Sequence, residues 1–325
     1  MKRLMIYFFY DKDGIVDDYV PYFLEKFKPY CEEICTVVNG TVTKESRKKL
    51  EKYSNIVLER KNIGFDSGAY KHGIKHYGYE KLKEYDELIL ANFTMFGPIY
   101  SPQEMFDTME KRDCDFWGIT KHPASKYSMA GIKICEHVQS YFLIYNKKLL
   151  NSKDFEIYWE TLQTATNYEE AVAFHELRTT SFFKSKGYKY DTFINFEKYM
   201  SQIEDKESFF YPLIQQIEED RMPFIKRKIF QCSKGKLSYN IKGGIVDLLT
   251  YVKEHTDYDL KLIWDNIIRG NYMEIDSSYL KYQYYRCKIL QYILWNKRKH
   301  YKDKIEICKN QLKLIDFIEK SKLNL

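Results

Sequence analysis

The chain has 325 residues, of which 44% are hydrophobic and 30% charged, a composition that indicates a soluble globular protein and excludes a disordered one. No apolar run approaches the roughly 20 residues that a membrane-spanning helix needs, and seven scattered cysteines without a CxxC pair favour a reduced, cytoplasmic protein. Residues 221–325 hold 22 Lys and Arg against 11 Asp and Glu, whereas residues 1–220 hold 30 against 35. This basic end suits an anionic membrane surface or another polyanion.

Strands and helices alternate over the first hundred residues. The basic start and short apolar run at the N-terminus have the look of a signal peptide, but the run breaks at Asp11 and no small-residue cleavage site follows, so we predict a strand. The predicted strands are 4–10, 34–38, 56–58 and 88–91, with helices at 17–29, 43–53 and 69–77 and a loop at 64–68. This alternation predicts an α/β protein with a mostly parallel sheet flanked by helices.

The second half of the chain changes character. We predict strands at 115–119, 138–145 and 187–193, and helices at 154–165 and 168–186. From about residue 245 the pattern is mostly helical. We therefore expect an α/β domain over residues 1–230 and a basic, mainly helical C-terminal extension over 231–325.

Polar residues follow each of the first four predicted strands. Because the carboxyl ends of parallel strands meet at one edge of a sheet, ligands bind there, and we expect these side chains to converge. Gly64 and Gly68 allow close approach of the backbone, Asn39 and Asp66 can bind a ribose or base, and Arg60 can face a phosphate. The residues predicted to bind such a nucleotide-containing ligand are Tyr10, Asp11, Asn39, Arg60, Asn62, Gly64, Asp66 and Asn92. In a second interpretation the glycines only shape a turn and Asp66 caps the following helix.

Several longer motifs carry a resemblance. The order of strand, NxGxDSGAY, strand and polar tip resembles nucleotide-sugar glycosyltransferases of the GT-A fold. RKNIGFDSGAYKHGI, YDELILANFTMFGPIY, DCDFWGITKHP, EHVQSYFLIYNK and YPLIQQIEEDRMPFIKRKIF are similar to the rhamnan synthesis protein F family of bacterial surface-polysaccharide assembly, over most of residues 1–230. The resemblance implies inverting transfer of a sugar, often rhamnose, from a dTDP- or UDP-sugar to a growing or lipid-linked glycan.

The sequence departs from this family at the polar tip after the fourth strand. GT-A enzymes usually carry an acidic DxD-like motif there that holds Mg²⁺ or Mn²⁺ on the donor diphosphate, and the relatives have Asn-Asp-Ser/Thr. This chain has Asn92-Phe93-Thr94, so Asn92 and Thr94 are weak metal ligands. Three explanations stay open: a carboxylate from elsewhere compensates, Arg or Lys replaces the metal, or activity is impaired.

The segment Phe174-His175-Glu176-Leu177-Arg178-Thr179 supplies the predicted catalytic residue. Many GT-A transferases place an acidic pair on such a helix, with a glycine about eleven residues after the second acid; Gly187 stands eleven after Glu176, and His175 replaces the first acid. Thr179 stands where those enzymes have a leucine. Glu176 therefore resembles the general base that takes the acceptor's proton. A solvated surface glutamate is the alternative.

Four more residues are candidates for binding the acceptor. His122, His137 and Gln139 lie on segments that relatives use around the acceptor, and Trp117 could stack on the face of a sugar. A histidine beside a strand is also a common structural residue, and a tryptophan commonly fills a core. The sequence alone leaves both interpretations open.

The segment 279–302 mixes Tyr, Trp, Ile and Leu with Arg and Lys, which is typical of an amphipathic interfacial helix and equally of a packing helix with a basic outer side. The first interpretation places the protein peripherally on the inner face of the plasma membrane. No nucleic-acid module is visible, so we expect no nucleic-acid partner. Besides a glycosyltransferase, the sequence allows a catalytically impaired carbohydrate-binding or scaffold protein of the same machinery.

Overall fold

A computed structural model describes residues 1–204, 212–233, 236–237 and 241–270, and eight single residues beyond them. The chain forms two compact units, Met1–Glu197 and Lys198–Leu325, whereas the sequence suggested a boundary at residue 230. The predicted amphipathic segment 279–302 lies outside the described residues apart from three single positions.

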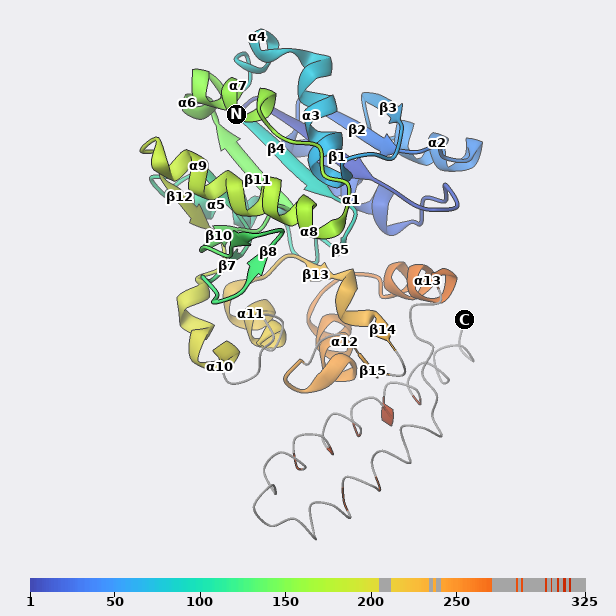
Figure 1. The fold of residues 1–325 in the computed structure, drawn as a ribbon. Helices are drawn as coiled ribbons and strands as arrows, with labels where there is room; N and C mark the ends of the chain where they lie inside the picture. Colours follow the sequence, from blue (N-terminus) through green and yellow to red (C-terminus); the bar gives the residue numbers. More distant parts are fainter. Residues whose placement is uncertain are drawn as a thin grey trace. The chain divides into compact units, whose positions relative to one another are not determined.

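A seven-stranded sheet forms the centre of the first unit (Figure 1). Its strands, in spatial order, are β12 (Tyr190–Thr192), β6 (Phe116–Gly118), β11 (Phe142–Asn146), β4 (Glu87–Asn92), β1 (Arg3–Phe9), β2 (Glu33–Asn39) and β3 (Ile56–Arg60). Only β11 runs antiparallel to its neighbours; the other pairs are parallel. The predicted α/β class with a mostly parallel sheet is therefore confirmed.

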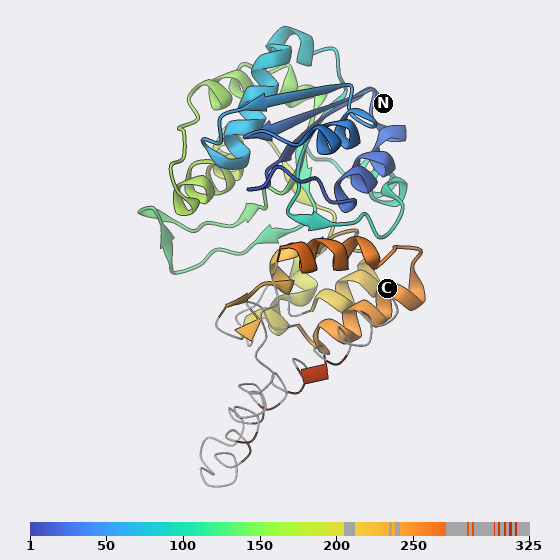
Figure 2. The ribbon, with the colours of Figure 1, turned by 90° about the vertical axis from the view of Figure 1, so that its right-hand side faces the viewer.

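Helices cover both faces of this sheet because its central strands are apolar on both faces. Every residue of β1 and β4 is buried. Leu4, Ile6 and Phe8 share one core cluster with residues of α3 (Phe65–Tyr77), α7 (Lys153–Glu160) and α9 (Arg178–Ser185). On the other face Tyr7 packs on Phe23 of α1 (Tyr19–Phe27), with ring centroids 5.1 Å apart. Figure 2 shows the strands between these two layers.

The remaining elements of the first unit are short. They are η1 (Lys28–Tyr30), α2 (Lys44–Glu51), α4 (Tyr79–Leu82), β5 (Met95–Phe96), α5 (Pro102–Met109), β7 (Lys121–His122), β8 (Ser128–Met129), β9 (Ile132–Lys133), β10 (His137–Val138), α6 (Lys147–Leu150), α8 (Tyr168–Ala171) and η2 (Val172–Leu177). Helix α8, the π-helical turn η2 and α9 follow one another without a break, so the predicted helix at 168–186 is confirmed. π-Helical turns are frequent at functional sites, and this one contains Glu176.

Two sequence predictions about local structure were wrong. The expected loop 64–68 is mostly the first turn of α3, because Gly64 adopts a left-handed conformation (φ 77°) that ends the preceding loop and lets the helix start at Phe65. The expected strand 138–145 is two strands: β10 pairs with β7, and only β11 joins the main sheet. Residues 139–141 turn the chain between the two.

The second unit is mainly helical in its described part. Its elements are η3 (Phe196–Tyr199), which begins two residues before the boundary, α10 (Met200–Glu204), α11 (Leu213–Asp220), β13 (Ile225–Lys226), η4 (Arg227–Phe230), the hairpin β14 (Cys232–Ser233) and β15 (Lys236–Leu237), α12 (Gly244–His255) and α13 (Lys261–Arg269). Helices α12 and α13 agree with the helical pattern expected from residue 245. Among the described residues, no helix combines the length and apolarity needed to cross a membrane.

Candidate functional site

The polar residues that follow β2, β3 and β4 converge, as the sequence predicted, whereas those that follow β1 do not join them. We call Asn39, Arg60, Asn62, Asp66 and Asn92 the strand-tip cluster. Arg60 Nη1 donates to Asn39 Oδ1 at 2.6 Å, and Asn39 Nδ2 donates to Asn62 Oδ1 at 3.3 Å. Asn92 Nδ2 donates to Asp66 Oδ2 at 3.4 Å. Asn39 Nδ2 also donates to the carbonyl oxygen of Phe65 at 3.1 Å, so the ends of β2, β3 and β4 are all joined to the start of α3.

Arg60 is a cation without a carboxylate partner among the described residues. Its Nη1 also donates to the carbonyl oxygen of Ile63 at 2.8 Å, and burial lowers the pKa of its guanidinium. A Cβ on Gly68 would lie 3.3 Å from this guanidinium and 2.7 Å from the Ile63 carbonyl oxygen, so only glycine fits beside it. A half-buried guanidinium beside the start of a helix favours an anionic ligand.

Asp66 lies in the first turn of α3 and has two roles in the structure. Its Oδ1 accepts from the backbone N–H of Ser67 at 2.8 Å, and its Oδ2 faces Asn92. Gly64 occupies the N-cap position of the helix. A Cβ atom on Gly64 would lie 3.3 Å from the methyl carbon of Thr164. Asp66 therefore supports the helix start, where a carboxylate is favoured, and also belongs to the strand-tip cluster.

Tyr10 and Asp11, also predicted to bind the donor, stand apart from these hydrogen bonds. Asp11 Oδ1 accepts from the backbone N–H groups of Asp13 at 3.0 Å and Ile15 at 3.1 Å. Tyr10 is half-buried and packs against the core cluster. Asp11 thus shapes its own turn at the end of β1.

The segment 92–94 does not fit a divalent cation. Asn92 Oδ1 accepts from both the backbone N–H of Thr94 at 3.1 Å and its hydroxyl at 2.6 Å. Asp66 is the single carboxylate of the strand-tip cluster, and within the described part of the chain no three His, Cys, Asp or Glu side chains gather into a metal site. Mg²⁺ and Mn²⁺ favour carboxylate oxygens, which Asn92 and Thr94 lack.

Glu176 lies in a second group of side chains, which we call the base cluster: His137, Ser140 and Glu176. Its Oε2 accepts from the backbone N–H of Ser140 at 2.9 Å and from the Ser140 hydroxyl at 2.7 Å. Its Oε1 lies 3.4 Å from His137 Nε2. Burial by itself raises the pKa of Glu176, but His137 and the two Ser140 donors outweigh it and hold the pKa well below the usual range. Glu176 is therefore an ionised, largely enclosed carboxylate and no surface residue.

The two clusters are neighbours. Ser140 is followed by Tyr141, whose carbonyl oxygen accepts from the backbone N–H of Asn92 at 3.2 Å. On the other side, the ring of Tyr70 from α3 lies 6.0 Å from that of His175, the residue before Glu176. The backbone of Tyr141 thus joins the base cluster to Asn92 of the strand-tip cluster.

His175, which takes the place of an acidic residue, is a structural residue. Tyr158 Oη lies 2.8 Å from His175 Nδ1, and the Thr179 hydroxyl donates to the His175 carbonyl oxygen at 2.7 Å. Burial lowers the pKa of His175 to about 4, so the ring is neutral at pH 7. Thr179, where a leucine was expected, supports this buried turn.

Of the four predicted acceptor-binding residues, two are enclosed. The side chain of His137 is 2% exposed and lies behind Glu176, and Trp117 is 3% exposed between the rings of Phe106 and Phe142. Neither side chain can touch an acceptor, so the prediction that His137 and Trp117 bind the acceptor is wrong, and both are interior residues.

The other two acceptor candidates, His122 and Gln139, are half-buried. His122 stacks on His137 with ring centroids 5.1 Å apart and an interplanar angle of 11°. Gln139 Oε1 accepts from the Thr120 hydroxyl at 2.7 Å. Both keep part of their surface open and stay acceptor-binding predictions.

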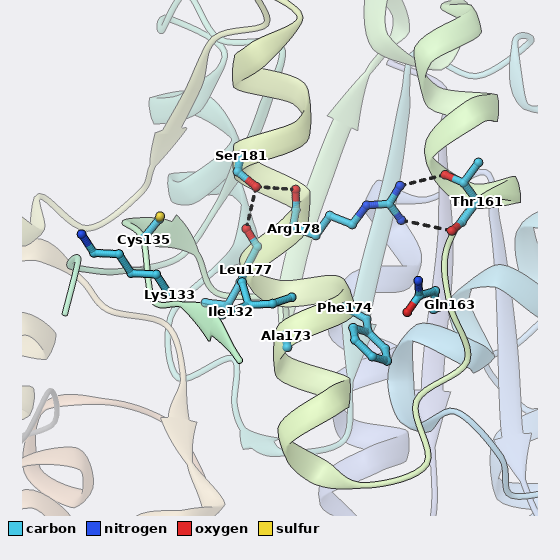
Figure 3. A pocket seen from close by; sticks show the side chains of 10 residues that line it. All are labelled: Ile132, Lys133, Cys135, Thr161, Gln163, Ala173, Phe174, Leu177, Arg178 and Ser181. Atoms are coloured by element: carbon cyan, nitrogen blue, oxygen red, sulfur yellow. Dashed lines mark hydrogen bonds between the residues drawn. The ribbon is translucent and has the colours of Figure 1, made fainter. Parts of the chain in front are cut away.

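Sequence reasoning missed a pocket of about 390 Å³ on another side of the helix that carries Glu176 (Figure 3). In it the Arg178 guanidinium reaches across to the carbonyl oxygen and hydroxyl of Thr161, at 3.3 and 2.8 Å. Its lining is Ile132, Lys133, Cys135, Thr161, Gln163, Ala173, Phe174, Leu177, Arg178 and Ser181. The spacing of Phe174 and Arg178 by four residues on one helix was the signal available.

Comparisons with known proteins complete the description. The family model described as rhamnan synthesis protein F matches residues 34–312. Uncharacterized protein y4gN of Sinorhizobium fredii is 25% identical over 155 residues, which are 48% of this chain and 39% of that protein, so the chain spans less than half of this relative.

Similar solved structures include 4-diphosphocytidyl-2C-methyl-D-erythritol synthase from Anaerococcus prevotii (12% identity, TM-score 0.36, covering 59% of this chain and 86% of that one). TarS residues 1–349 from S. aureus are 14% identical with a TM-score of 0.35, covering 59% of this chain and 61% of that one. Core-mannan synthase A from Aspergillus fumigatus is 11% identical with a TM-score of 0.30, covering 54% of this chain and 66% of that one. These likenesses are too weak to support an argument about function. The family model covers most of the sequence, and this chain belongs to the rhamnan synthesis protein F family.

Proposed function

We propose that this protein transfers a sugar from a nucleotide-sugar donor to a glycan acceptor with inversion at the anomeric carbon. The observation that carries the proposal is the juxtaposition of two clusters that the backbone of Tyr141 connects. One holds a guanidinium without a carboxylate partner among the described residues, and the other holds an enclosed, ionised carboxylate. Membership of a rhamnan synthesis family supports a role in polysaccharide synthesis.

In this proposal the strand-tip cluster holds the donor. Arg60 and the backbone N–H groups at the start of α3 bind the diphosphate, because a guanidinium and a helix N-terminus both favour phosphate oxygens. Asn39, Asn62 and Asp66 supply the hydrogen-bonding groups that a ribose or base requires. Since the segment 92–94 does not fit a divalent cation, Arg60 stabilises the negative charge that develops on the departing diphosphate.

Glu176 then acts as the general base. As the acceptor oxygen attacks the anomeric carbon, its proton passes to Glu176, a C–O bond forms, and the bond from the anomeric carbon to the diphosphate breaks. The nucleoside diphosphate leaves with the electron pair of that bond. Ser140 holds Glu176 Oε2 with two hydrogen bonds, which leaves Oε1 to receive the proton.

We also propose the finer identity of the reaction from the family alone. A dTDP- or UDP-activated sugar, with rhamnose the first choice, would be moved to a surface polysaccharide or its lipid-linked precursor in the cytoplasm. Peripheral binding to the inner face of the membrane through the basic C-terminal extension is part of this proposal. Loss of salt-sensitive binding to anionic liposomes on deletion of residues 271–325 would support it.

The test uses the full chain with a panel of dTDP-, UDP- and GDP-sugars, measuring donor turnover and donor affinity. Glu176→Gln keeps the shape and removes the base, so we expect a loss of transfer of about 10²–10⁴-fold with unchanged donor affinity. Glu169→Gln is the matched control, because Glu169 is an exposed residue of α8. Full turnover by Glu176→Gln would reassign the base.

A scaffold or carbohydrate-binding role is the second candidate, and Phe93 in place of an acidic residue favours it. The same panel separates the two functions. Donor or glycan binding without turnover of any sugar, in a folded wild-type protein, would support the scaffold and contradict the transferase.

A further inference from the structure

We infer that the pocket beside Arg178 binds a sugar unit that carries a carboxylate or a phosphate, as part of the glycan acceptor. The inference rests on the proposed function where it names the acceptor, but binding of the sugar is measured without turnover. The pocket has a volume of about 390 Å³, which is within the range of small-molecule sites. All ten lining residues belong to the first unit, and none belongs to the strand-tip cluster or the base cluster.

The pocket combines an apolar floor with polar edges (Figure 3). Its floor is one side of the helix formed by η2 and α9, where Ala173 and Leu177 are buried and Phe174 presents an aromatic ring. At one edge lies the exposed Gln163, whose side-chain amide makes no hydrogen bond within the described part of the chain. A sugar ring has apolar C–H faces and a rim of hydroxyl groups, so it matches a floor and edges of this kind.

The Arg178 guanidinium is held in place at the same edge. Its Nη1 donates to the Thr161 carbonyl oxygen at 3.3 Å, and its Nη2 donates to the Thr161 hydroxyl at 2.8 Å. It also lies over the rings of Tyr158 and Phe182, 5.1 and 5.5 Å from their centroids. These contacts use two of the five N–H groups of a guanidinium, and the described residues offer no carboxylate to the others. A guanidinium fixed in this way is prepared to bind a carboxylate or phosphate.

The charges around the pocket also favour an anion. None of the ten described residues that line it is acidic. Lys71 adds a second cation close by, because its Nζ donates to the carbonyl oxygens of Glu160 at 3.0 Å and Leu162 at 3.1 Å. The Glu160 carboxylate is itself paired with Lys75 at 3.0 Å. Lys133 extends away from the helix in Figure 3, so Arg178 is the lining cation that a ligand meets.

The pocket adjoins both clusters of the candidate site. Thr164 follows one lining residue, and its methyl carbon would lie 3.3 Å from a Cβ on Gly64 at the start of α3. The carbonyl oxygen of Cys135, another lining residue, lies 2.7 Å from His137 Nδ1. Glu176 is not among the lining residues, and a helix with its side chains is about 10–12 Å across. The bound sugar is therefore a neighbour of the reacting unit in the glycan and not the unit that gives its proton to Glu176.

The test measures binding of three sugars to the full chain by ligand-observed NMR titration: glucose, glucuronate and glucose 6-phosphate. We expect at least one of the two anions to bind about tenfold more tightly than glucose, and the tighter anion identifies the charged group. Arg178→Gln should abolish this preference and leave the affinity for glucose nearly unchanged. Phe174→Leu should weaken binding of all three sugars about threefold, because the aromatic face is lost. Lys184→Gln, an exposed residue of α9, is the matched control and should change nothing.

The outcomes separate the inference from the function on which it rests. Equal affinities of the wild-type protein for the three sugars, or an anion preference that survives Arg178→Gln, would overturn the inference. A preference that Arg60→Gln abolishes and Arg178→Gln keeps would also overturn it, because the anion would then lie at the strand-tip cluster. Absence of turnover on every donor would remove the proposed function and leave the binding result standing. If Arg178→Gln does not fold, Phe174→Leu decides, since unchanged binding of all three sugars would contradict the pocket.

Discussion

The strand-tip cluster and the base cluster lie side by side but are built on opposite principles. In the strand-tip cluster a cation without a carboxylate partner in the described part of the chain is surrounded by amides at the edge of the sheet. In the base cluster an anion is enclosed, with two hydrogen bonds from Ser140 and with His137 Nε2 at 3.4 Å. In our proposal the first receives an anionic ligand from solvent, and the second keeps one carboxylate ionised in a fixed place. Changes in the first should therefore alter binding, and changes in the second should alter turnover.

The largest expected effect on stability comes from His175, which lies beside the base. Its pKa is lowered from 6.5 to about 4, so between these pH values the unfolded chain binds more protons than the folded one. This contribution to stability is complete above pH 6.5 and falls by about 3 kcal/mol as the pH drops to 4. His175→Gln should flatten the pH dependence of the free energy of unfolding in urea within this window. His76→Gln, which changes an exposed histidine of α3, should keep the wild-type slope. Equal slopes for both variants would contradict the burial of a neutral His175.

The next largest effect is on donor affinity and tests whether the strand-tip cluster binds the donor diphosphate. Arg60→Gln removes a charge-assisted contact to the diphosphate, and we expect donor Kd to rise about 30-fold, which corresponds to about 2 kcal/mol, with a smaller change in kcat. Lys48→Gln removes the same charge from the exposed side of α2 and should leave Kd unchanged. Isothermal titration with the donor measures both. A fall in kcat with unchanged Kd would mean that Arg60 acts in turnover and does not bind the donor.

A smaller effect tests the base cluster, where we expect a change in turnover and none in donor binding. Ser140→Ala deletes the hydroxyl that donates to Glu176 Oε2 at 2.7 Å and leaves the backbone donor. We expect kcat to fall about tenfold with unchanged donor KM, because a lost hydrogen bond to a charged group is worth about 1.5 kcal/mol. Ser185→Ala, at the exposed end of α9, is the matched control. A raised KM with normal kcat would mean that Ser140 contacts the donor.

The smallest effect concerns metal. Because the segment 92–94 offers no carboxylate and Asn92 Oδ1 is occupied by Thr94, we expect EDTA to lower turnover by less than about twofold. The measurement is donor turnover before and after chelation, followed by addition of Mn²⁺ or Mg²⁺. A large loss that these ions restore would show that Asp66 and the donor oxygens complete a metal site.

Local patterns were enough to predict the sheet and the strand-tip cluster. Apolar runs of strand length ended in Asn39, Arg60 and Asn92, and parallel strands bring their carboxyl ends to one edge whatever the details of packing. The exact start of α3 was missed because it depends on one left-handed glycine, Gly64, whose conformation no periodicity reveals. The split of 138–145 was missed because an apolar run does not show which partner each half pairs with.

The sequence by itself determined the α/β class through local periodicity, and it indicated the family and Glu176 as the candidate base through the resemblance of its motifs to known transferases. Only the tertiary structure decided what surrounds Glu176 and that His137 lies behind it, out of an acceptor's reach. The physical reason is that hydrogen bonds between residues far apart in the sequence, such as Glu176 and Ser140, 36 positions apart, depend on how helix and strand pack. The same packing enclosed Trp117 and left Arg60 without a carboxylate among the described residues.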